Sequence, residues 1–174
     1  AFEIPADQAE AFAFTPGQYL TLATDIDGQE ARRSYSICSA PGDPYLRVGV
    51  KKVADGRFST FVNDVLSVGD TIRVMPPQGR FTALKGERHD YLLFAAGSGI
   101  TPMLSIARTV LAHEPESTIT LVYGNRSTET IMFLEELNDL KDRYMGRFTL
   151  IHLLSRETQD VELLNGRIDA ERVG

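Results

Sequence analysis

The fold is decided by Tyr91-Leu92-Leu93-Phe94-Ala95-Ala96-Gly97-Ser98-Gly99-Ile100-Thr101-Pro102, an apolar run that leads into a glycine turn. Six apolar residues in succession predict a parallel strand that is covered on both faces. The two glycines permit a tight turn, and Thr101 followed by Pro102 suits the N-cap and the first position of a helix. We therefore expect a strand, a turn and a helix in direct succession.

The second half of the chain repeats this pattern. Apolar stretches at residues 119–123 and 148–154 predict two more parallel strands, and residues 101–112 and 128–144 predict the helices between them. Such alternation requires right-handed crossovers and an open sheet, whose ligand site lies beyond the carboxyl ends of its strands. The second helix carries an apolar stripe at helical spacing, made of Ile131, Leu134, Leu137 and Leu140.

The first half of the chain has a different pattern. Residues 45–52 alternate between apolar and other residues, which is typical of a strand buried on one face. Residues 18–24 and 71–75 predict two more strands, the second ended by Pro76-Pro77, and residues 58–66 predict a short helix. Short strands separated by Gly and Pro turns favour a small antiparallel barrel.

The boundary between the two patterns is the polar segment at residues 86–90. We therefore expect an all-β antiparallel barrel over residues 1–86, followed by an α/β parallel-sheet domain over residues 87–174. A chain of 174 residues that is 43% hydrophobic is long and apolar enough to form two small cores.

Composition excludes several classes of partner. The chain has 18 Lys and Arg against 24 Asp and Glu, and its net charge of −6 argues against a nucleic acid or an anionic membrane as the main partner. An acidic surface suits a basic partner protein, although solubility alone also favours surplus acid. No apolar run approaches the ~20 residues of a membrane span and no leader opens the chain, so we expect a cytoplasmic protein.

The sequence also predicts no metal site. Cys38 is the only cysteine, which excludes an internal disulfide and a four-thiolate iron–sulfur cluster within the chain. Any [2Fe–2S] cluster is therefore expected outside it. His89, His113 and His152 show no ligand spacing, and we interpret them as structural or surface groups.

Candidate ligand-binding residues follow each predicted parallel strand. Gly97 and Gly99 let a phosphate approach the backbone at the start of a helix, whose free N–H groups favour an anion. The alternative is an ordinary tight connection between strand and helix, because such connections also favour glycine. After the next two strands come Asn125-Arg126-Ser127 and Ser155-Arg156.

These two arginines predict a preference between the nicotinamide nucleotides. An acidic residue at the end of the second strand binds the 2′-hydroxyl of NADH, whereas an arginine with a hydroxyl neighbour suits the 2′-phosphate of NADPH. We therefore expect NADPH to be preferred, with NADH possible. In the alternative interpretation, Arg126 and Arg156 pair with Glu129 and Glu157 on a solvated rim.

The first half holds two further candidate sites. In Arg33-Ser34-Tyr35-Ser36 a guanidinium can bind a pyrophosphate, an aromatic ring can lie on a flavin ring, and a hydroxyl can bond a ring nitrogen. Alternation places Tyr35 and Ser36 on opposite faces of an ideal strand, so both reach one flavin only if the strand end bends. Gly56-Arg57-Phe58-Ser59 opens the short helix and forms a second candidate anion seat. The alternatives are a strand with a surface arginine and an ordinary capped helix.

Taken in order, these motifs resemble the ferredoxin–NADP reductase superfamily over nearly the whole chain. The motifs are Arg33-x-Tyr35-Ser36, Val50-Lys51, Gly56-Arg57-Phe58-Ser59, Gly79-Arg80-Phe81 and Gly97-Ser98-Gly99-Ile100-Thr101-Pro102. Within the superfamily, residues 123–126, 131–137 and 154–157 look most like the reductase components of phenylacetyl-CoA oxygenase systems. The resemblance implies a FAD-binding barrel followed by an NADP-binding α/β domain.

The resemblance also implies roles for single residues. Arg33 would bind the flavin diphosphate, and residues 56–59 would bind the pyrophosphate. Tyr35 would lie against the isoalloxazine, Ser36 near N5 and Thr101 near the nicotinamide, so these three would align the reacting rings. The complete set of expected cofactor-binding residues is Arg33, Ser34, Tyr35, Ser36, Val50, Lys51, Gly56, Arg57, Phe58, Ser59, Gly97, Ser98, Gly99, Thr101, Pro102, Asn125, Arg126, Ser127, Ser155 and Arg156.

The function implied is transfer of hydride from NADPH to FAD and then of single electrons to an iron–sulfur domain or ferredoxin that serves an oxygenase component. The family also continues past Gly174 into the rest of the nucleotide domain and a [2Fe–2S] domain, so we expect this chain to be a fragment. Two alternatives stay open. One is a stand-alone ferredoxin or flavodoxin reductase, and the other is a non-catalytic module that binds a nucleotide or a partner.

Overall fold

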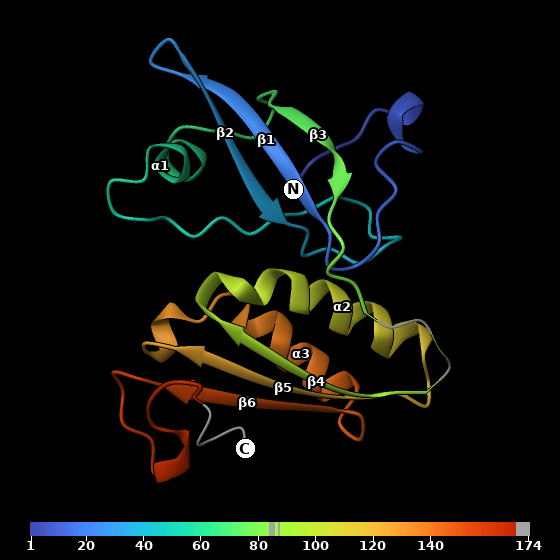
Figure 1. Cartoon of the computed structure of the whole chain (residues 1–174), viewed down its shortest axis with the longest axis vertical. Helices are drawn as coiled ribbons and strands as arrows, with labels where there is room; N and C mark the ends of the chain where they lie inside the picture. The colour runs from blue at the N-terminus through green and yellow to red at the C-terminus, as the bar shows by residue number, and fades with distance from the viewer. Residues whose placement is uncertain (84–85, 87, 170–174) are drawn as a thin grey trace. The chain divides into compact units, whose positions relative to one another are not determined.

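The computed structural model describes residues 1–83, 86 and 88–169. The chain divides into two compact units, Ala1–Ala83 and Leu84–Gly174 (Figure 1). Residue 87 of the expected boundary segment and residues 170–174 of the expected second domain lie outside the described residues. None of the helices in the described part of the chain has the length and apolar character that crossing a membrane requires.

The first unit is built on an antiparallel sheet in the order β2-β1-β3. Strands β1 (Tyr19–Ile26) and β2 (Gln29–Ser36) form a hairpin. Asp27 and Gly28 turn it with φ values of 52° and 73°, the positive pair that a type I′ hairpin turn needs. The remaining elements are strand β3 (Arg73–Gln78), the 3-10 helix η1 (Ala6–Gln8) and helix α1 (Arg57–Asp64).

The core of this unit lies between the sheet and α1, which contacts β1 and β2. Leu20 and Leu22 of β1 are fully buried there because alternation turns both toward the helix. The other buried members of the cluster are Phe12, Ile37, Leu46 and Phe58. An antiparallel β unit followed by a parallel α/β unit is the fold class that the sequence predicts.

Two strand predictions in this unit need correction. Residues 45–52 do not form a regular strand, because Leu46 bridges to Phe2 and Val48 bridges to Ile37, so the segment pairs with two different neighbours in turn. Strand β3 does not end at Pro76-Pro77 but includes both prolines. They are tolerated because β3 is an edge strand, and its register against β1 shifts beside them.

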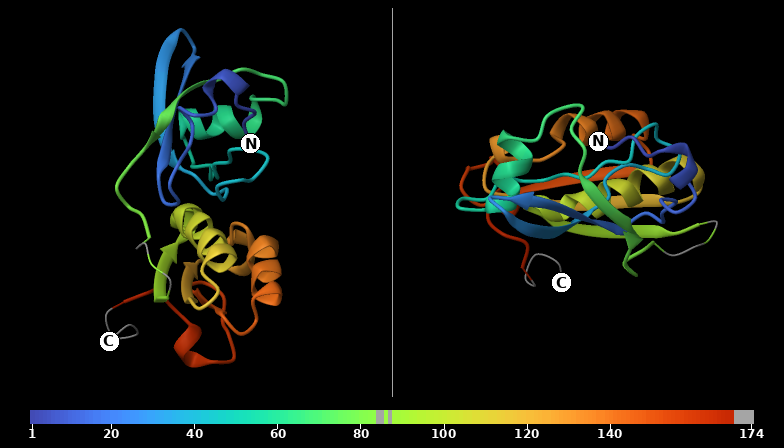
Figure 2. Two further views of the ribbon diagram at one scale, coloured as in Figure 1. Left: turned by 90° about the vertical axis from the view of Figure 1, so that its right-hand side faces the viewer. Right: turned by 90° about the horizontal axis from the view of Figure 1, so that it is seen from above.

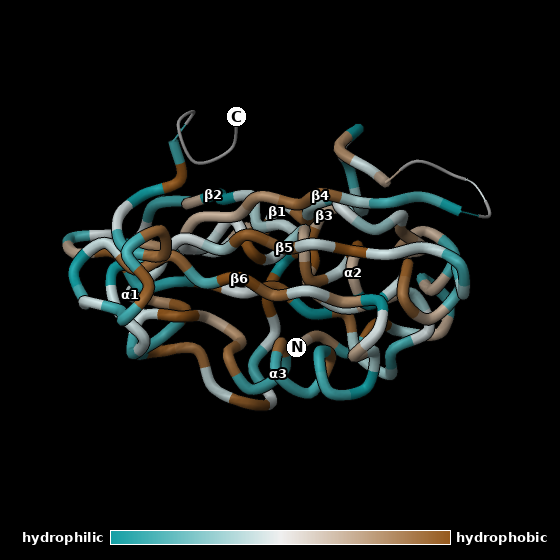
Figure 3. The backbone as a smooth tube through the Cα atoms, turned by 90° about the horizontal axis from the view of Figure 1, so that it is seen from below, coloured by the Kyte–Doolittle hydropathy of each residue, from teal (hydrophilic) through white to brown (hydrophobic). Residues whose placement is uncertain are grey.

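The second unit is a parallel sheet in the order β4-β5-β6. Its strands are β4 (Asp90–Ala96), β5 (Thr118–Asn125) and β6 (Phe148–Leu154), close to the three predicted apolar stretches, and brown hydrophobic residues recur along them in Figure 3. Helices α2 (Ile100–His113) and α3 (Leu134–Arg143) connect them. The strands follow one another across the sheet in chain order, and both connections are right-handed crossovers. Both helices therefore lie on the same face of the sheet (Figure 2). Short 3-10 helices complete the unit at η2 (Gly97–Gly99), η3 (Thr128–Thr130) and η4 (Glu162–Leu164).

The two faces of this sheet differ in burial. On the helix side Ile119, Leu121 and Tyr123 of β5 are at most 1% exposed. On the other side Leu92 of β4 is 57% exposed, so the expected cover on both faces is not provided by the described residues.

Both predicted helices differ from the structure in detail. Helix α2 begins at Ile100 with Gly99 as its N-cap, so Thr101 lies inside the helix and not at its cap. The predicted helix over residues 128–144 is interrupted at Phe133, which has a left-handed backbone conformation with φ of 60°. The interruption leaves Ile131 outside α3, while Leu137 and Leu140 keep their buried positions.

Arg147 stabilises the C-terminus of α2 by donating hydrogen bonds to the carbonyls of Leu111, Glu114 and Ser117 at 2.7, 2.8 and 3.1 Å. Because hydrogen bonds from a charged donor contribute most, we expect Arg147→Ala to lower the free energy of unfolding of this unit by about 2 kcal/mol. Urea denaturation followed by circular dichroism measures the change. Arg143→Ala, at the exposed end of α3, is the matched control and should shift the midpoint little. Equal destabilisation by both variants would contradict the capping role.

Candidate functional site

The carboxyl ends of the parallel strands lie at one edge of the second sheet. Ala96 at the end of β4 is level with Gly124 of β5. Hydrogen bonding between β5 and β6 continues past the strands, because Arg156 N–H donates to the Arg126 carbonyl at 2.8 Å. The structure therefore brings the two predicted arginines side by side on neighbouring connections.

The glycine turn after β4 lies at the same edge. Gly97 has a φ of 51°, which favours glycine, whereas Gly99 has an ordinary φ of −64°. A Cβ added to Gly99 would meet no atom within 4 Å from the described residues other than its neighbours in the chain. The fold itself therefore does not require glycine at position 99, and the open space in front of its backbone is available to a ligand.

The other residues of the turn are held from within. Thr101 Oγ1 donates to the Ser98 carbonyl at 3.0 Å, and the buried Tyr123 hydroxyl donates to the Gly97 carbonyl at 2.8 Å. Pro102 follows in the first turn of α2 and has no N–H to donate. The Ile100 N–H bonds back to the carbonyls of Gly97 and Ser98. The other backbone N–H groups at the start of a helix lack partners within the helix, so this turn can bind an anion.

In the part of the chain that the structure describes, the two arginines do not form the ion pairs with glutamates that the alternative interpretation expects. Neither Arg126 nor Arg156 forms a salt bridge with any residue in the described ranges 1–83, 86 and 88–169. Glu157 instead accepts two hydrogen bonds of 2.7 Å, from the backbone N–H and the hydroxyl of Thr128. These bonds hold the pKa of the Glu157 carboxyl below its usual value. They also connect the segment after β6 to the segment after β5.

Asn125 is the most unusual polar group at this edge. Its residue is only 8% exposed, and its side chain interacts with the buried Tyr123 hydroxyl. Neither its side-chain nitrogen nor its side-chain oxygen has a hydrogen bond of good geometry among the described residues. Leaving a buried amide unsatisfied is costly, so a ligand that offers both a donor and an acceptor would be favoured here. Ser127 beside it closes a capping box with Thr130, so its hydroxyl stabilises η3.

In the first unit, Arg33 and Tyr35 lie on the inner face of β2. They are level with Leu22 and Leu20 of β1, which are buried. The Tyr35 ring is half-buried and contacts the Phe58 ring of α1, with centroids 5.9 Å apart and planes tilted by 33°. Burial raises the pKa of the Tyr35 hydroxyl. Strand β2 and the start of α1 are therefore brought together by this aromatic contact.

The serines of the same motif lie on the other face of β2. Ser34 Oγ is 3.0 Å from Thr21 Oγ1, and Ser36 ends the strand level with Tyr19. Beyond Ser36 the alternation stops, because Ile37 and Cys38 are both fully buried in succession. Arg33 itself donates to the carbonyl of its neighbour Arg32 at 2.7 Å.

The start of α1 is a tight loop built around Ser59. Its hydroxyl donates to the Gly56 carbonyl at 3.0 Å and accepts from Val53 N–H at 3.2 Å. A Cβ added to Gly56 would lie 2.4 Å from that hydroxyl oxygen and 3.0 Å from the Val53 carbonyl. Glycine is therefore required at position 56 by the loop's own packing. The Val50 carbonyl accepts a bond of 3.3 Å from Asn63 of α1, which holds the Val50-Lys51 segment beside the helix.

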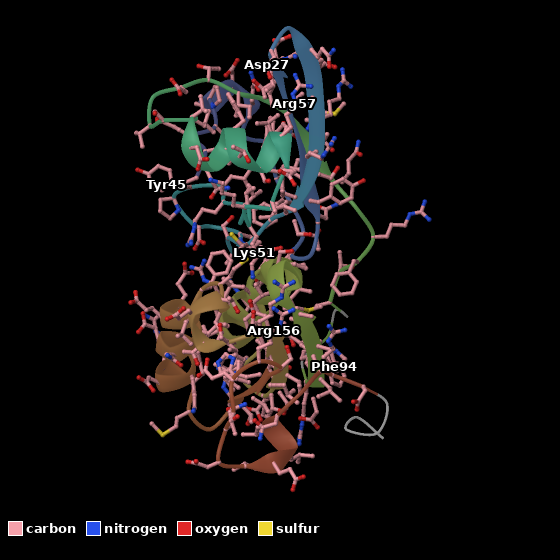
Figure 4. The ribbon with its side chains drawn as sticks, turned by 90° about the vertical axis from the view of Figure 1, so that its left-hand side faces the viewer. Asp27, Tyr45, Lys51, Arg57, Phe94 and Arg156 are labelled. Carbon is pink, nitrogen blue, oxygen red and sulfur yellow. The ribbon has the colours of Figure 1, made fainter. Side chains whose placement is uncertain are left out.

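Arg57 faces the β1–β2 hairpin and not the loop. Its guanidinium donates to the Ile26 carbonyl and, at 3.1 Å, to the Gln29 side chain. It also forms a salt bridge of 3.5 Å with Asp27, and Figure 4 shows Arg57 and Asp27 together at the tip of the hairpin. Any anion at this helix start would therefore be bound by backbone N–H groups more than by the Arg57 side chain.

Two contacts at this edge were not predicted: the bond from Tyr123 to the Gly97 carbonyl and the bonds that Glu157 accepts from Thr128. Tyr123 is the only tyrosine in β5, and a buried tyrosine hydroxyl usually forms a hydrogen bond. That signal could have indicated a contact, although not that the partner is Gly97.

Comparison with known proteins matches both units. Residues 1–83 match the oxidoreductase FAD-binding domain family, and residues 93–173 match the oxidoreductase NAD-binding domain family. The chain belongs to the ferredoxin reductase family. Its two domains are those of an FAD-dependent NAD(P)H oxidoreductase, so the family assigns FAD to the first unit and a nicotinamide nucleotide to the second.

Several members of the ferredoxin reductase family are similar to this chain. One subunit of the 1,2-phenylacetyl-CoA epoxidase from Escherichia coli (strain K12) is 48% identical over 99% of this chain and 49% of its own length. The ferredoxin reductase component of 3-ketosteroid-9-alpha-monooxygenase from Rhodococcus rhodochrous is 42% identical over 88% of this chain and 44% of its own length. This chain thus spans about half the length of these relatives.

The fold is also that of solved family structures. The flavohem-like FAD/NAD-binding domain of nitric oxide dioxygenase from Vibrio cholerae O1 biovar El Tor superposes with a TM-score of 0.79 at 26% identity. The superposition covers 90% of this chain and 67% of that one.

Proposed function

We propose that this chain is the FAD- and NADPH-binding part of a cytoplasmic reductase component, which oxidises NADPH and delivers single electrons to an iron–sulfur domain or ferredoxin. An oxygenase component would be the final recipient. The observation that carries this proposal is the arrangement of residues at the edge of the second sheet, in a chain whose residues 1–83 match the FAD-binding domain family. That edge brings together the glycine turn, the buried Asn125 amide and the two arginines Arg126 and Arg156. Neither arginine side chain has a partner among the described residues.

The residues at that edge would divide the nucleotide between them. Backbone N–H groups of the Gly97–Thr101 turn would bind the pyrophosphate, and Arg126 with Arg156 would bind the 2′-phosphate, which favours NADPH over NADH. The side-chain amide of Asn125 would form hydrogen bonds with the nucleotide. Thr101 would lie near the nicotinamide as a group that aligns it.

The residues of the first unit would hold the flavin. Tyr35 offers a half-buried ring as a stacking surface, and the backbone at the start of α1 offers N–H groups to the pyrophosphate. Ser36 at the strand end would lie near N5, and Arg33 would have to leave its contact with the Arg32 carbonyl to bind the diphosphate. Bound FAD supplies the chemistry that converts a two-electron hydride into single electrons, so the protein need supply only binding and alignment.

An absorbance experiment tests the proposal. We expect the purified chain to be yellow, with the visible absorption of bound flavin, and to lose that absorption when NADPH is added without oxygen. Colour without bleaching would indicate a module that binds cofactors without transferring hydride. A colourless protein that takes up no added FAD would contradict the proposal.

A further inference from the structure

Tyr123 joins two parts of the nucleotide edge that are far apart in the sequence. It lies in the middle strand β5 and is fully buried, yet its hydroxyl crosses to the connection after β4 and donates to the Gly97 carbonyl at 2.8 Å. The ring is also held from the β6 side, where its centroid is 5.8 Å from that of the His152 ring. The hydroxyl therefore has a fixed position relative to the sheet.

The Gly97 carbonyl is a sensitive point for the turn. Gly97 adopts a φ of 51°, and glycine has more alternative backbone conformations than any other residue. A rotation of the peptide that carries this carbonyl would also reorient the N–H of Ser98, at the entry to helix α2. A hydrogen bond from a rigid, buried donor limits that rotation.

We propose that Tyr123 is a positioning residue, whose hydroxyl fixes the Gly97 peptide so that the N–H groups of the following turn converge on the nucleotide pyrophosphate. This inference rests on the proposed function and deepens it. Tyr123 does not touch the nucleotide, and its hydroxyl acts through the Gly97 carbonyl. The same hydroxyl also interacts with the Asn125 side chain and the Met132 backbone. Removal of the Tyr123 hydroxyl should weaken the binding of ligands that carry a pyrophosphate and leave the binding of other ligands unchanged.

Tyr123→Phe removes the hydroxyl and keeps the ring, so it tests the bond with little loss of packing. Isothermal titration of the full chain with NADPH should show a Kd about fivefold higher, the size expected when one such hydrogen bond is lost. Titration with adenosine 2′-monophosphate, which has no pyrophosphate, should give an unchanged Kd. The matched control is Tyr91→Phe, because Tyr91 in β4 donates to Glu114 at the opposite end of the sheet. It should leave both constants unchanged.

Two outcomes would overturn the inference. One is an NADPH affinity in Tyr123→Phe equal to that of the unmodified chain. The other is an equal loss for NADPH and adenosine 2′-monophosphate, because that would indicate a general structural role. An unmodified chain with no affinity for NADPH would overturn the proposed function together with the inference, whereas the first two outcomes leave the proposed function standing.

Discussion

Replacing Arg126 with Ala is expected to raise the KM for NADPH about thirtyfold, because a bidentate guanidinium–phosphate contact contributes about 2 kcal/mol. NADH lacks the 2′-phosphate, so its KM should change by less than about twofold if Arg126 contacts only that group. The guanidinium has no salt bridge to lose among the described residues, so its removal should cost little stability. Steady-state reduction of a dye acceptor, measured with both nucleotides, gives the two constants.

Arg143→Ala provides the matched control for this experiment. It removes the same charge from the exposed end of α3 and should leave both KM values unchanged. Equal increases with NADPH and NADH in Arg126→Ala would contradict the assignment of Arg126 to the 2′-phosphate. Arg156→Ala tests the neighbour, whose backbone is bonded to Arg126, and should also act on NADPH alone.

The second unit could be predicted from sequence more completely than the first. Its strands are continuous apolar runs that local pattern identifies, and the topology then places their carboxyl ends together. The interruption at Phe133 could not be predicted, because residues 128–144 keep helical spacing on both sides of it. The sequence likewise predicts Thr101 as the N-cap because threonine before proline suits a helix start, but the 3-10 turn before it moves the start of the helix to Ile100.

In the first unit, pairing depends on partners that are distant in the sequence. Residues 45–52 alternate as a strand does, but they meet Phe2 on one side and Ile37 on the other. The sequence locates the site motifs of this unit, but it does not reveal which hydrogen bonds their residues form. Ser59 holds its own loop and Arg57 holds the hairpin, and neither contact is visible in a linear pattern.

Gly99→Ala is expected to raise the Kd for NADPH at least about fivefold without unfolding the protein. The fold leaves room for a methyl group, since apart from its chain neighbours no described residue has an atom within 4 Å of the position it would take, and the backbone φ of −64° suits any residue. The cost should therefore appear only when a ligand approaches the backbone, where an added methyl group typically costs about 1–3 kcal/mol of overpacking. Fluorescence titration with NADPH measures the affinity, and thermal unfolding without nucleotide measures stability.

Gly146→Ala is the matched control for Gly99→Ala. Gly146 also has open space around its Cβ position, but it precedes β6 at the opposite end of the sheet from Gly99. A methyl group there should change neither the NADPH affinity nor the flavin content. Gly97→Ala separates the other possible cause, because its φ of 51° would strain an alanine and lower stability by about 1 kcal/mol even without a ligand. If Gly99→Ala bound NADPH as tightly as the unmodified chain, the pyrophosphate could not lie against this turn.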